Sequence, residues 1–352
     1  MRLFQNLILL VAILFVSCEN NEFELSENAD EFFFLRNNGA DLPVQVKGNT
    51  ASKTMIVYLH GGPAGKGAFG DWALIEGDFF NSVTKEYAMV LFDQRGSGSS
   101  QGHYSKDLLT QEQFVDDLNK LILLLNSKYG SDIKVFLYGV SWGGYLGNAY
   151  LTSYDYQEKI SGWINDCGSH NILLDANSGK QMVIYYAKQQ IALNKNTSEW
   201  REMLSWFESK DTILELNDFA TAYSYLDEAG KLMRDSISSS IVWDSKAVNK
   251  MKYNSPYSAS SVFSNNVFND FVAKNYTILN LTDKMQIIAT PTLLIRGKYD
   301  FGVTQEVVDD AFSKISSDIK YKVTFEKSGH GVWSFETEEF TRIFKEFISE
   351  NI

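Results

Sequence analysis

The chain has 352 residues, of which 44% are hydrophobic and 22% are charged. This composition is typical of a globular protein, and the length is enough for a large core. The formal net charge of −12 argues against nucleic acid as a partner, because a phosphate backbone requires a basic protein surface.

The first residues have the pattern of a secretory signal. Arg2 precedes ten uninterrupted apolar residues, 7–16, which as a helix would cover about half of a bilayer core. Ser17 and Cys18 follow directly, which resembles a bacterial lipobox. The resemblance implies a signal peptide over residues 1–17 and a lipid on Cys18, which would anchor the protein to a membrane of the bacterial cell envelope. An ordinary secretory signal followed by an unmodified cysteine is the alternative.

A polar, acidic stretch, residues 18–30, is expected to form a tether, after which eight apolar, β-rich runs begin. They are residues 32–35, 44–46, 55–59, 88–92, 135–138, 160–164, 293–295 and 321–325. The middle runs alternate with helical patterns, of which the clearest is 114–125. This alternation predicts an α/β fold with a mostly parallel, eight-stranded sheet that is flanked by helices.

The alternation stops between residues 168 and 288. Trp200, Met203, Leu204 and Phe207 have helical spacing there, and aromatic residues are frequent. We therefore expect a helical lid, residues 168–288, inserted between two parts of the core. Those parts are residues 31–167 and 289–352.

The most informative motif is Gly-Val-Ser-Trp-Gly-Gly, residues 139–144. It follows the apolar run 135–138 and precedes a helix-like segment, which is the arrangement of a nucleophile elbow. The sharp turn lifts a serine hydroxyl above the sheet, and the glycines two residues away on either side leave room for it. The motif predicts that Ser141 is a nucleophile.

A serine nucleophile needs a base within hydrogen-bonding reach and a third group that orients the base. His330 lies just past the last expected strand and is the predicted base. Asp300 leaves the preceding strand and is the predicted acid; the alternative is an aspartate that only forms a turn. The histidines at 103 and 170 have no supporting pattern and are expected at the surface.

Attack on a carbonyl creates an oxyanion, which needs preorganised N–H donors. Trp142, the residue after the nucleophile, is expected to supply one donor. Gly62, in the sequence His-Gly-Gly-Pro at residues 60–63, is expected to supply the other. A phosphate-binding loop is the alternative for this stretch, but residues 65–67 lack its Gly-Lys-Ser/Thr ending.

The sequence indicates neither a cofactor nor a metal. The four histidines are scattered, and neither His-Glu-x-x-His nor a metal-binding pair of cysteines is present. Cys167 follows an apolar pair and is expected to be a small, buried core residue.

Three motifs together resemble those of the proline iminopeptidase (prolyl aminopeptidase) family of α/β-hydrolases. They are residues 60–63, residues 93–99 (Asp-Gln-Arg-Gly-Ser-Gly-Ser) and residues 139–144. Ala64 departs from the family, which usually has glycine at that position. The resemblance implies an α/β-hydrolase fold and the release of an N-terminal residue, proline or another small or apolar one, from short peptides through an acyl-enzyme.

In such enzymes, acidic residues of the lid hold the free amino group of the substrate. Glu199, Glu202 and Glu208 are candidates for this role, and solvated helix surface is the alternative for each. Arg95 and Asp93 of the second motif are expected to tie loops near the site by ion pairing and to have no catalytic role.

Two other functions remain open. A carboxylesterase, amidase or lactonase would use the same triad, because the fold fixes acyl transfer but not the acyl group. A non-catalytic binding module is the more remote alternative, since the order Ser141, Asp300, His330 is complete.

Overall fold

The computed structural model describes residues 25–63, 65–71, 77–237, 271–272 and 274–352. The expected signal peptide, Cys18, the first part of the expected tether and Ala64 lie outside the described residues. No helix in the described part of the chain is both long and apolar enough to cross a membrane.

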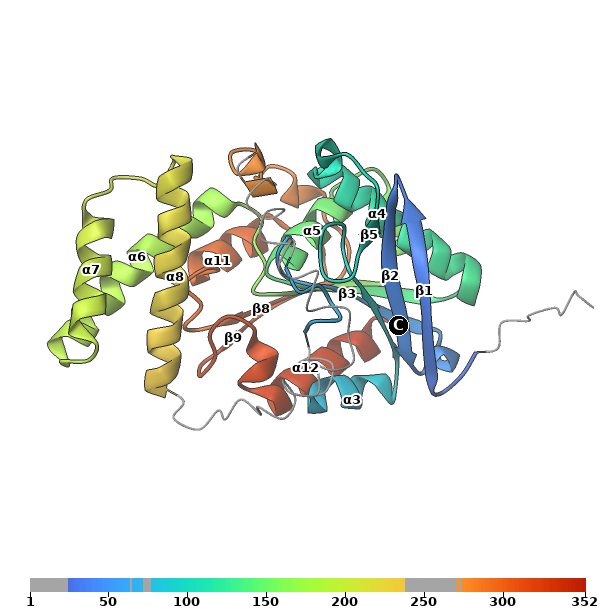
Figure 1. Cartoon of the computed structure of the whole chain (residues 1–352). Helices are drawn as coiled ribbons and strands as arrows, with labels where there is room; N and C mark the ends of the chain where they lie inside the picture. The colour runs from blue at the N-terminus through green and yellow to red at the C-terminus, as the bar shows by residue number, and fades with distance from the viewer. Residues whose placement is uncertain (1–24, 64, 72–76, 238–270, 273) are drawn as a thin grey trace, which may run out of the picture.

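One mixed β-sheet forms the centre of the molecule (Figure 1). Its strands are β1 (Ala29–Asn37), β2 (Ala40–Gly48), β3 (Thr54–Leu59), β4 (Ala88–Phe92), β5 (Gln101–Gly102), β6 (Lys134–Val140), β7 (Gly162–Asp166), β8 (Thr292–Gly297) and β9 (Lys320–Phe325). The order is β1-β2-β4-β3-β6-β7-β8-β9, and β5 pairs with β2. Strands from β4 to β9 along this order are parallel, whereas β1, β2 and β5 pair in antiparallel fashion.

All eight expected strands are present, and the sheet contains a ninth. The additional strand, β5, is a two-residue pairing with exposed side chains, so no hydrophobic pattern marks it in the sequence. β1 begins at Ala29, so the last two residues of the expected tether belong to the sheet. The parallel strands β3, β4 and β8 are buried along their whole length, as expected for strands that are covered on both faces.

Helices cover both faces of this sheet (Figure 1). On one face, α3 (Asp78–Thr84) and α12 (Thr337–Glu350) pack through phenylalanines such as Phe79 and Phe344. The opposite face carries α4 (Gln111–Tyr129), α5 (Trp142–Leu151) and α11 (Gln305–Lys314). The predicted helix 114–125 lies within α4, which begins after a cap in which Thr110 accepts a hydrogen bond from the backbone N–H of Gln113.

The insertion between β7 and β8 is helical. It contains α6 (Ile172–Ala192), α7 (Thr197–Glu208) and α8 (Leu216–Ile237), which lie to the left in Figure 1. Trp200, Met203 and Phe207 form the buried face of α7, as their spacing predicted. The start of α6 packs closely on the loop after β8, where a Cβ atom on Gly179 would lie 2.4 Å from the carbonyl oxygen of Phe301.

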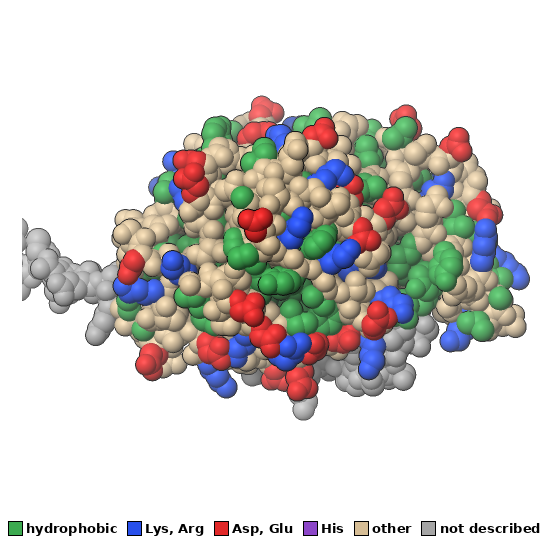
Figure 2. Space-filling view, turned by 180° about the vertical axis from the view of Figure 1, so that it is seen from behind, with side chains coloured by type: hydrophobic (Ala, Val, Ile, Leu, Met, Phe, Trp, Pro, Cys, Tyr) green, Lys and Arg blue, Asp and Glu red, His purple; other side chains and the backbone are tan. Residues whose placement is uncertain are grey.

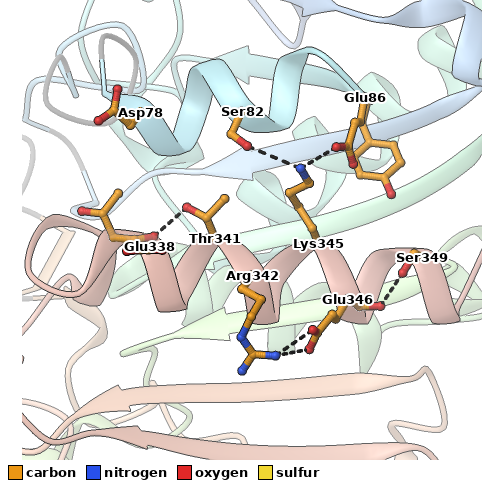
Figure 3. Close-up of a pocket in the computed structure, with 11 residues that line it drawn as sticks. Asp78, Ser82, Glu86, Glu338, Thr341, Arg342, Lys345, Glu346 and Ser349 are labelled. Atoms are coloured by element: carbon orange, nitrogen blue, oxygen red, sulfur yellow. Dashed lines mark hydrogen bonds and ion pairs between the residues drawn. The ribbon is translucent and has the colours of Figure 1, made fainter.

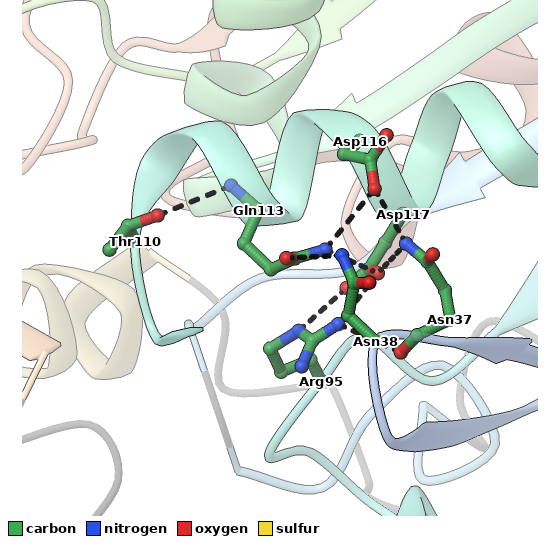
Figure 4. Close-up of polar contacts among 7 residues, drawn as sticks. All are labelled: Asn37, Asn38, Arg95, Thr110, Gln113, Asp116 and Asp117. Atoms are coloured by element: carbon green, nitrogen blue, oxygen red, sulfur yellow. Dashed lines mark hydrogen bonds and ion pairs between the residues drawn. The ribbon is translucent and has the colours of Figure 1, made fainter. Parts of the chain in front are cut away.

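A buried polar cluster ties the loop after β4 to α4 (Figure 4). Arg95 donates two hydrogen bonds to the carboxylate of Asp117, at 2.8 and 2.9 Å, and their side chains are 0% and 2% exposed. Asn37 and Gln113 also donate to Asp117. The expected ion pairing of Arg95 is confirmed, and its partner comes from α4.

The same expectation is wrong for Asp93. Its carboxylate accepts hydrogen bonds from the backbone N–H groups of Phe69 and Ser99, and among the described residues it has no ion pair. Burial raises the pKa of Asp93 to about 7. Asp93 therefore ties loops together through their backbones, without a cationic partner.

Candidate active site

Ser141 lies at the sharp turn between β6 and α5. Its φ of 57° and ψ of −118° are an unfavourable backbone conformation for a residue with a side chain. The following turn passes so close to β3 that a Cβ atom on Gly143 would lie 1.8 Å from the carbonyl oxygen of Leu59. Only glycine fits there, so the glycine of the motif is a requirement of the elbow.

The predicted base and acid are in contact. Nδ1 of His330 and Oδ2 of Asp300 are 2.8 Å apart. The other carboxylate oxygen, Oδ1, accepts from the backbone N–H groups of Gly302 and Val303, both at 2.9 Å. Asp300 therefore has both of the roles considered for it: it stabilises a turn and it orients His330.

The nucleophile and this pair lie at the same edge of the sheet. Ser141 follows β6, Asp300 follows β8 and His330 follows β9, and these strands are parallel to one another through β7. The carboxyl ends of parallel strands meet at one edge, which is where α/β folds place their reacting groups. This arrangement can carry out nucleophilic acyl transfer.

The two segments expected to form the oxyanion hole are held by Gln94. Its side chain accepts a hydrogen bond from Nε1 of Trp142 at 2.8 Å and donates one to the backbone oxygen of His60 at 3.1 Å. Its backbone N–H donates to Nε2 of His60. Burial lowers the pKa of His60 to about 4, so the ring is neutral and accepts this bond. Gln94 lies within a recognised motif, but sequence reasoning gave it no role.

The two segments that bear the predicted N–H donors lie beside the nucleophile. Trp142 is the first residue of α5, where a backbone N–H has no partner within the helix. Gly62 has a φ of 144°, and its neighbour Gly61 approaches Ser141, because a Cβ atom there would lie 4.0 Å from the serine Oγ. The loop that bears Gly62 and the start of α5 thus flank the serine.

The lid glutamates lie elsewhere. Glu199, Glu202 and Glu208 are exposed on α7. Glu202 accepts a hydrogen bond from Tyr225, and Glu208 pairs with Lys188. The structure does not bring these three side chains to the triad.

A different acidic residue of the insertion faces the triad. Asp175, on α6, is 1% exposed and accepts a hydrogen bond from Tyr223 on α8 at 3.4 Å. Its other carboxylate oxygen, Oδ1, has no hydrogen-bond partner among the described residues. Burial raises the pKa of Asp175 to about 8, and its charge interacts with those of Asp300 and His330. No periodicity or motif marks this residue in the sequence.

The remaining histidines are divided between surface and interior. His103 is exposed, as predicted. The prediction is wrong for His170, which is buried at the start of the insertion with its Nε2 2.7 Å from a carboxylate oxygen of Asp310. The partner lies on α11, so the contact depends on tertiary packing that the sequence does not display.

A groove on the molecular surface has no part in this site. It lies between α3 and α12, where Lys345 pairs with Glu86 and Arg342 pairs with Glu346 (Figure 3). It contains none of the predicted catalytic residues. The face in Figure 2 has acidic and basic side chains interspersed.

The carboxylates around His330 should shift its titration. Desolvation of the ring, whose side chain is 46% exposed to solvent, favours the neutral form, but Asp300, Asp166 and Asp175 together outweigh this effect and raise the pKa of His330 to about 9. A base acts in its neutral form, so kcat/KM for a short-chain nitrophenyl ester, which has no amino group to titrate, should increase with pH up to about 9, measured in the presence of a chelator. Asp175→Asn removes one of these negative charges, so the increase should occur at lower pH.

The control for this profile is Glu202→Gln, which changes an exposed carboxylate on α7 and should leave the pH dependence as it is. A wild-type rate that is constant from about pH 6 to pH 9 would contradict the elevated pKa of His330.

The sheet order, the elbow and the Asp-His pair define an α/β-hydrolase. Residues 53–338 match the family described as serine aminopeptidase, S33, and the chain belongs to this family. It is therefore a serine hydrolase of the S33 family.

Distant relatives and solved structures agree with this assignment. The chain is 26% identical over 307 residues to a proline iminopeptidase of Thermoplasma volcanium, covering 85% of this chain and 90% of the relative. It is 22% identical over 320 residues to a proline iminopeptidase of Heyndrickxia coagulans, covering 90% and 98%.

Two solved structures share the fold at low identity. A proline iminopeptidase-related protein from Thermus thermophilus superposes with a TM-score of 0.59 at 18% identity, covering 92% of this chain and 99% of that one. An esterase from Exiguobacterium antarcticum superposes with a TM-score of 0.58 at 19% identity, covering 91% and 100%.

Proposed function

We propose that this protein is a serine aminopeptidase that releases N-terminal residues, proline or other small or apolar ones, from short peptides. The family match and the distant proline iminopeptidases support this proposal. The observation that carries it is Asp175, a buried acid of the insertion whose charge interacts with those of Asp300 and His330 and whose Oδ1 has no hydrogen-bond partner among the described residues.

The proposed reaction has two steps. Oγ of Ser141 attacks the carbonyl carbon of the N-terminal residue while Nε2 of His330 takes the hydroxyl proton, and Asp300 stabilises the imidazolium. The N–H groups of Gly62 and Trp142 bind the oxyanion. His330 then gives its proton to the departing amine, which leaves an acyl-enzyme. Water, deprotonated by His330, attacks this ester and restores the free serine.

In this proposal, Asp175 binds the free N-terminal ammonium group of the substrate. The carboxyl is largely neutral at pH 7 in the free protein, because its pKa is about 8. An ammonium group close to Oδ1 would favour the carboxylate, so substrate binding would release a proton. The resulting charge-assisted hydrogen bond would place the first residue of the peptide, and only the first, beside Ser141.

Asp175→Asn tests this role because asparagine keeps the shape and removes the negative charge. We expect kcat/KM for proline and alanine arylamides to decrease by about 10- to 100-fold, the typical effect of losing a hydrogen bond to a charged group. The rate with a short-chain nitrophenyl ester, which has no amino group, should not decrease.

Glu202→Gln is the matched control, since Glu202 is the exposed lid acid on α7, and it should leave both rates unchanged. An equal decrease with arylamides and esters would show that Asp175 supports the fold of the site and does not bind the amino group.

An esterase, amidase or lactonase is the second candidate function. It is supported by the structural similarity to an esterase, together with a triad that suits any acyl group. Parallel assays on arylamides and nitrophenyl esters distinguish the two candidates. Ester turnover without arylamide turnover would replace the aminopeptidase with this alternative.

We also propose that a lipid on Cys18 attaches the enzyme to a membrane of the bacterial cell envelope. The apolar segment 7–16 followed by Ser17 and Cys18 supports this location. Substrates would then be short peptides outside the cytoplasm.

A further inference from the structure

The thiol of Cys167 lies against two members of the triad. Its Sγ, a carboxylate oxygen of Asp300 and a ring nitrogen of His330 all lie within 4.8 Å of one another. Cys167 directly follows β7 and has a φ of 53°, a conformation that few non-glycine residues adopt. The three side chains thus come from the ends of three adjacent parallel strands, β7, β8 and β9.

Thiolate, imidazole and carboxylate are the ligands that zinc prefers in proteins. We propose that Cys167, Asp300 and His330 form an inhibitory site for Zn²⁺, in which one bound ion removes the base and its acid from catalysis. This site would make the hydrolase reversibly sensitive to a thiophilic metal, without any role for the metal in the reaction itself.

The surroundings of the cluster favour a cation. Asp166, the neighbour of Cys167, is fully buried, and its carboxylate interacts with the Cys167 thiol. Its Oδ2 accepts from Tyr138 at 3.2 Å. The charge of Asp166 also interacts with His330. Burial, together with Asp166 and Asp300, raises the pKa of the Cys167 thiol, so Cys167 is a neutral thiol in the free protein. A dication would compensate the negative charge of the two buried carboxylates and of the thiolate that forms when the ion binds.

The site must rearrange to bind the ion, because its ligand atoms lie up to 4.8 Å apart, whereas tetrahedral zinc separates a sulfur ligand from a nitrogen or oxygen ligand by about 3.5 Å. Nδ1 of His330 is 2.8 Å from Asp300. Zinc bonds of about 2.0 Å in tetrahedral geometry separate two such ligands by about 3.3 Å, so this pair must open by roughly half an ångström. Below the pKa of His330 the ring carries protons on both nitrogens, so the thiol proton and the Nδ1 proton both leave to solvent, and Nδ1 binds the ion while Nε2 keeps its proton.

A metal ion can reach this site from solvent at His330. Its side chain is 46% exposed, whereas Cys167 and Asp300 are buried. The ion would therefore reach the thiol from the open side of the active site. Sequence spacing does not indicate this site, because its ligands lie in three separate loops.

Direct binding to the full-length protein tests the proposal. In Ser141→Ala, which keeps all three ligands, Cd²⁺ titration should give one sulfur-to-metal charge-transfer absorption per chain. This absorption should be lost in the double variant Ser141→Ala/Cys167→Ala. Cys18 is present in both proteins, so the difference reports Cys167 alone. Absence of a Cys167-dependent absorption would refute the site.

Zinc affinity and inhibition provide the second measurement. Competition with a chromophoric chelator should show that Cys167→Ala and His330→Ala each bind Zn²⁺ at least about 100-fold more weakly than the wild type. His103→Ala, which removes an exposed histidine, should bind as the wild type does. Wild-type affinity in Cys167→Ala would overturn the proposal. His330→Ala leaves the buried thiol in place, so it serves if Cys167→Ala does not fold.

Covalent labelling with a fluorophosphonate connects binding to inhibition. Zn²⁺ should slow labelling of the wild type, and EDTA should restore the original rate. Cys167→Ala should be labelled at the same rate with Zn²⁺ as without it. The inference rests on the triad of the proposed function. If the metal-free wild type is not labelled, the proposed function fails, while the Cd²⁺ absorption still decides the metal site.

Discussion

Ser141→Ala is expected to abolish covalent labelling by a fluorophosphonate and to lower kcat by roughly 10⁶-fold, the effect seen when a triad serine is removed. His330→Ala should have an effect of similar size, because a serine without its base is a poor nucleophile. The double variant should be no slower than either single variant, since the two groups act in the same step.

Matched controls make this result specific. Ser313→Ala changes an exposed serine on α11 and His103→Ala an exposed histidine, so both should be labelled like the wild type. A folded wild-type protein that is not labelled would favour a non-catalytic binding module. Full labelling of Ser141→Ala would place the nucleophile elsewhere in the chain.

Asp117→Ala should lower the free energy of unfolding by about 3–5 kcal/mol, the range for breaking a buried ion pair by removing one partner. The guanidinium of Arg95 is fully buried and donates two hydrogen bonds to Asp117 (Figure 4). Truncation leaves that charge without its counterion, and water cannot replace it. Urea denaturation followed by circular dichroism measures the loss.

Asp116→Ala is the control for the same cluster. Asp116 is the neighbouring acid on α4, accepts hydrogen bonds from Asn37 and Gln113, and is partly exposed, so its loss should cost much less. Replacing both Arg95 and Asp117 with leucine should recover much of the stability, because no buried charge remains. If Asp116→Ala and Asp117→Ala lowered the free energy of unfolding equally, the buried charge of Arg95 would not explain the contribution of this cluster to stability.

The sheet could be predicted because its signals are local. A central parallel strand such as β3 or β4 is buried on both faces and is therefore a continuous apolar run in the sequence. The elbow also has a local sequence signal, its two glycines around Ser141. Gly139 is required by a contact with Gly143, and Gly143 by a contact with Leu59 on the adjacent strand β3. Strand β5 has two exposed residues, and no such signal accompanies it.

The features that the sequence did not predict depend on contacts between elements that are far apart in the sequence. His170 is buried only because α11 brings Asp310 to it. Asp175 and Glu202 are both acidic residues on helices of the insertion, and nothing in the sequence says that one faces the triad and the other the solvent. Cys167 was expected to be buried, and it is, but its position beside Asp300 and His330 results from the order of the strands.

The position of the insertion has a consequence for how the enzyme is made. Ser141 is synthesised before α6–α8, whereas Asp300 and His330 are synthesised after them, in the loops that follow β8 and β9. A nascent or truncated chain that ends before residue 330 thus carries a nucleophile without its base. In the proposed mechanism, hydrolysis therefore requires synthesis past β9, at least as far as His330.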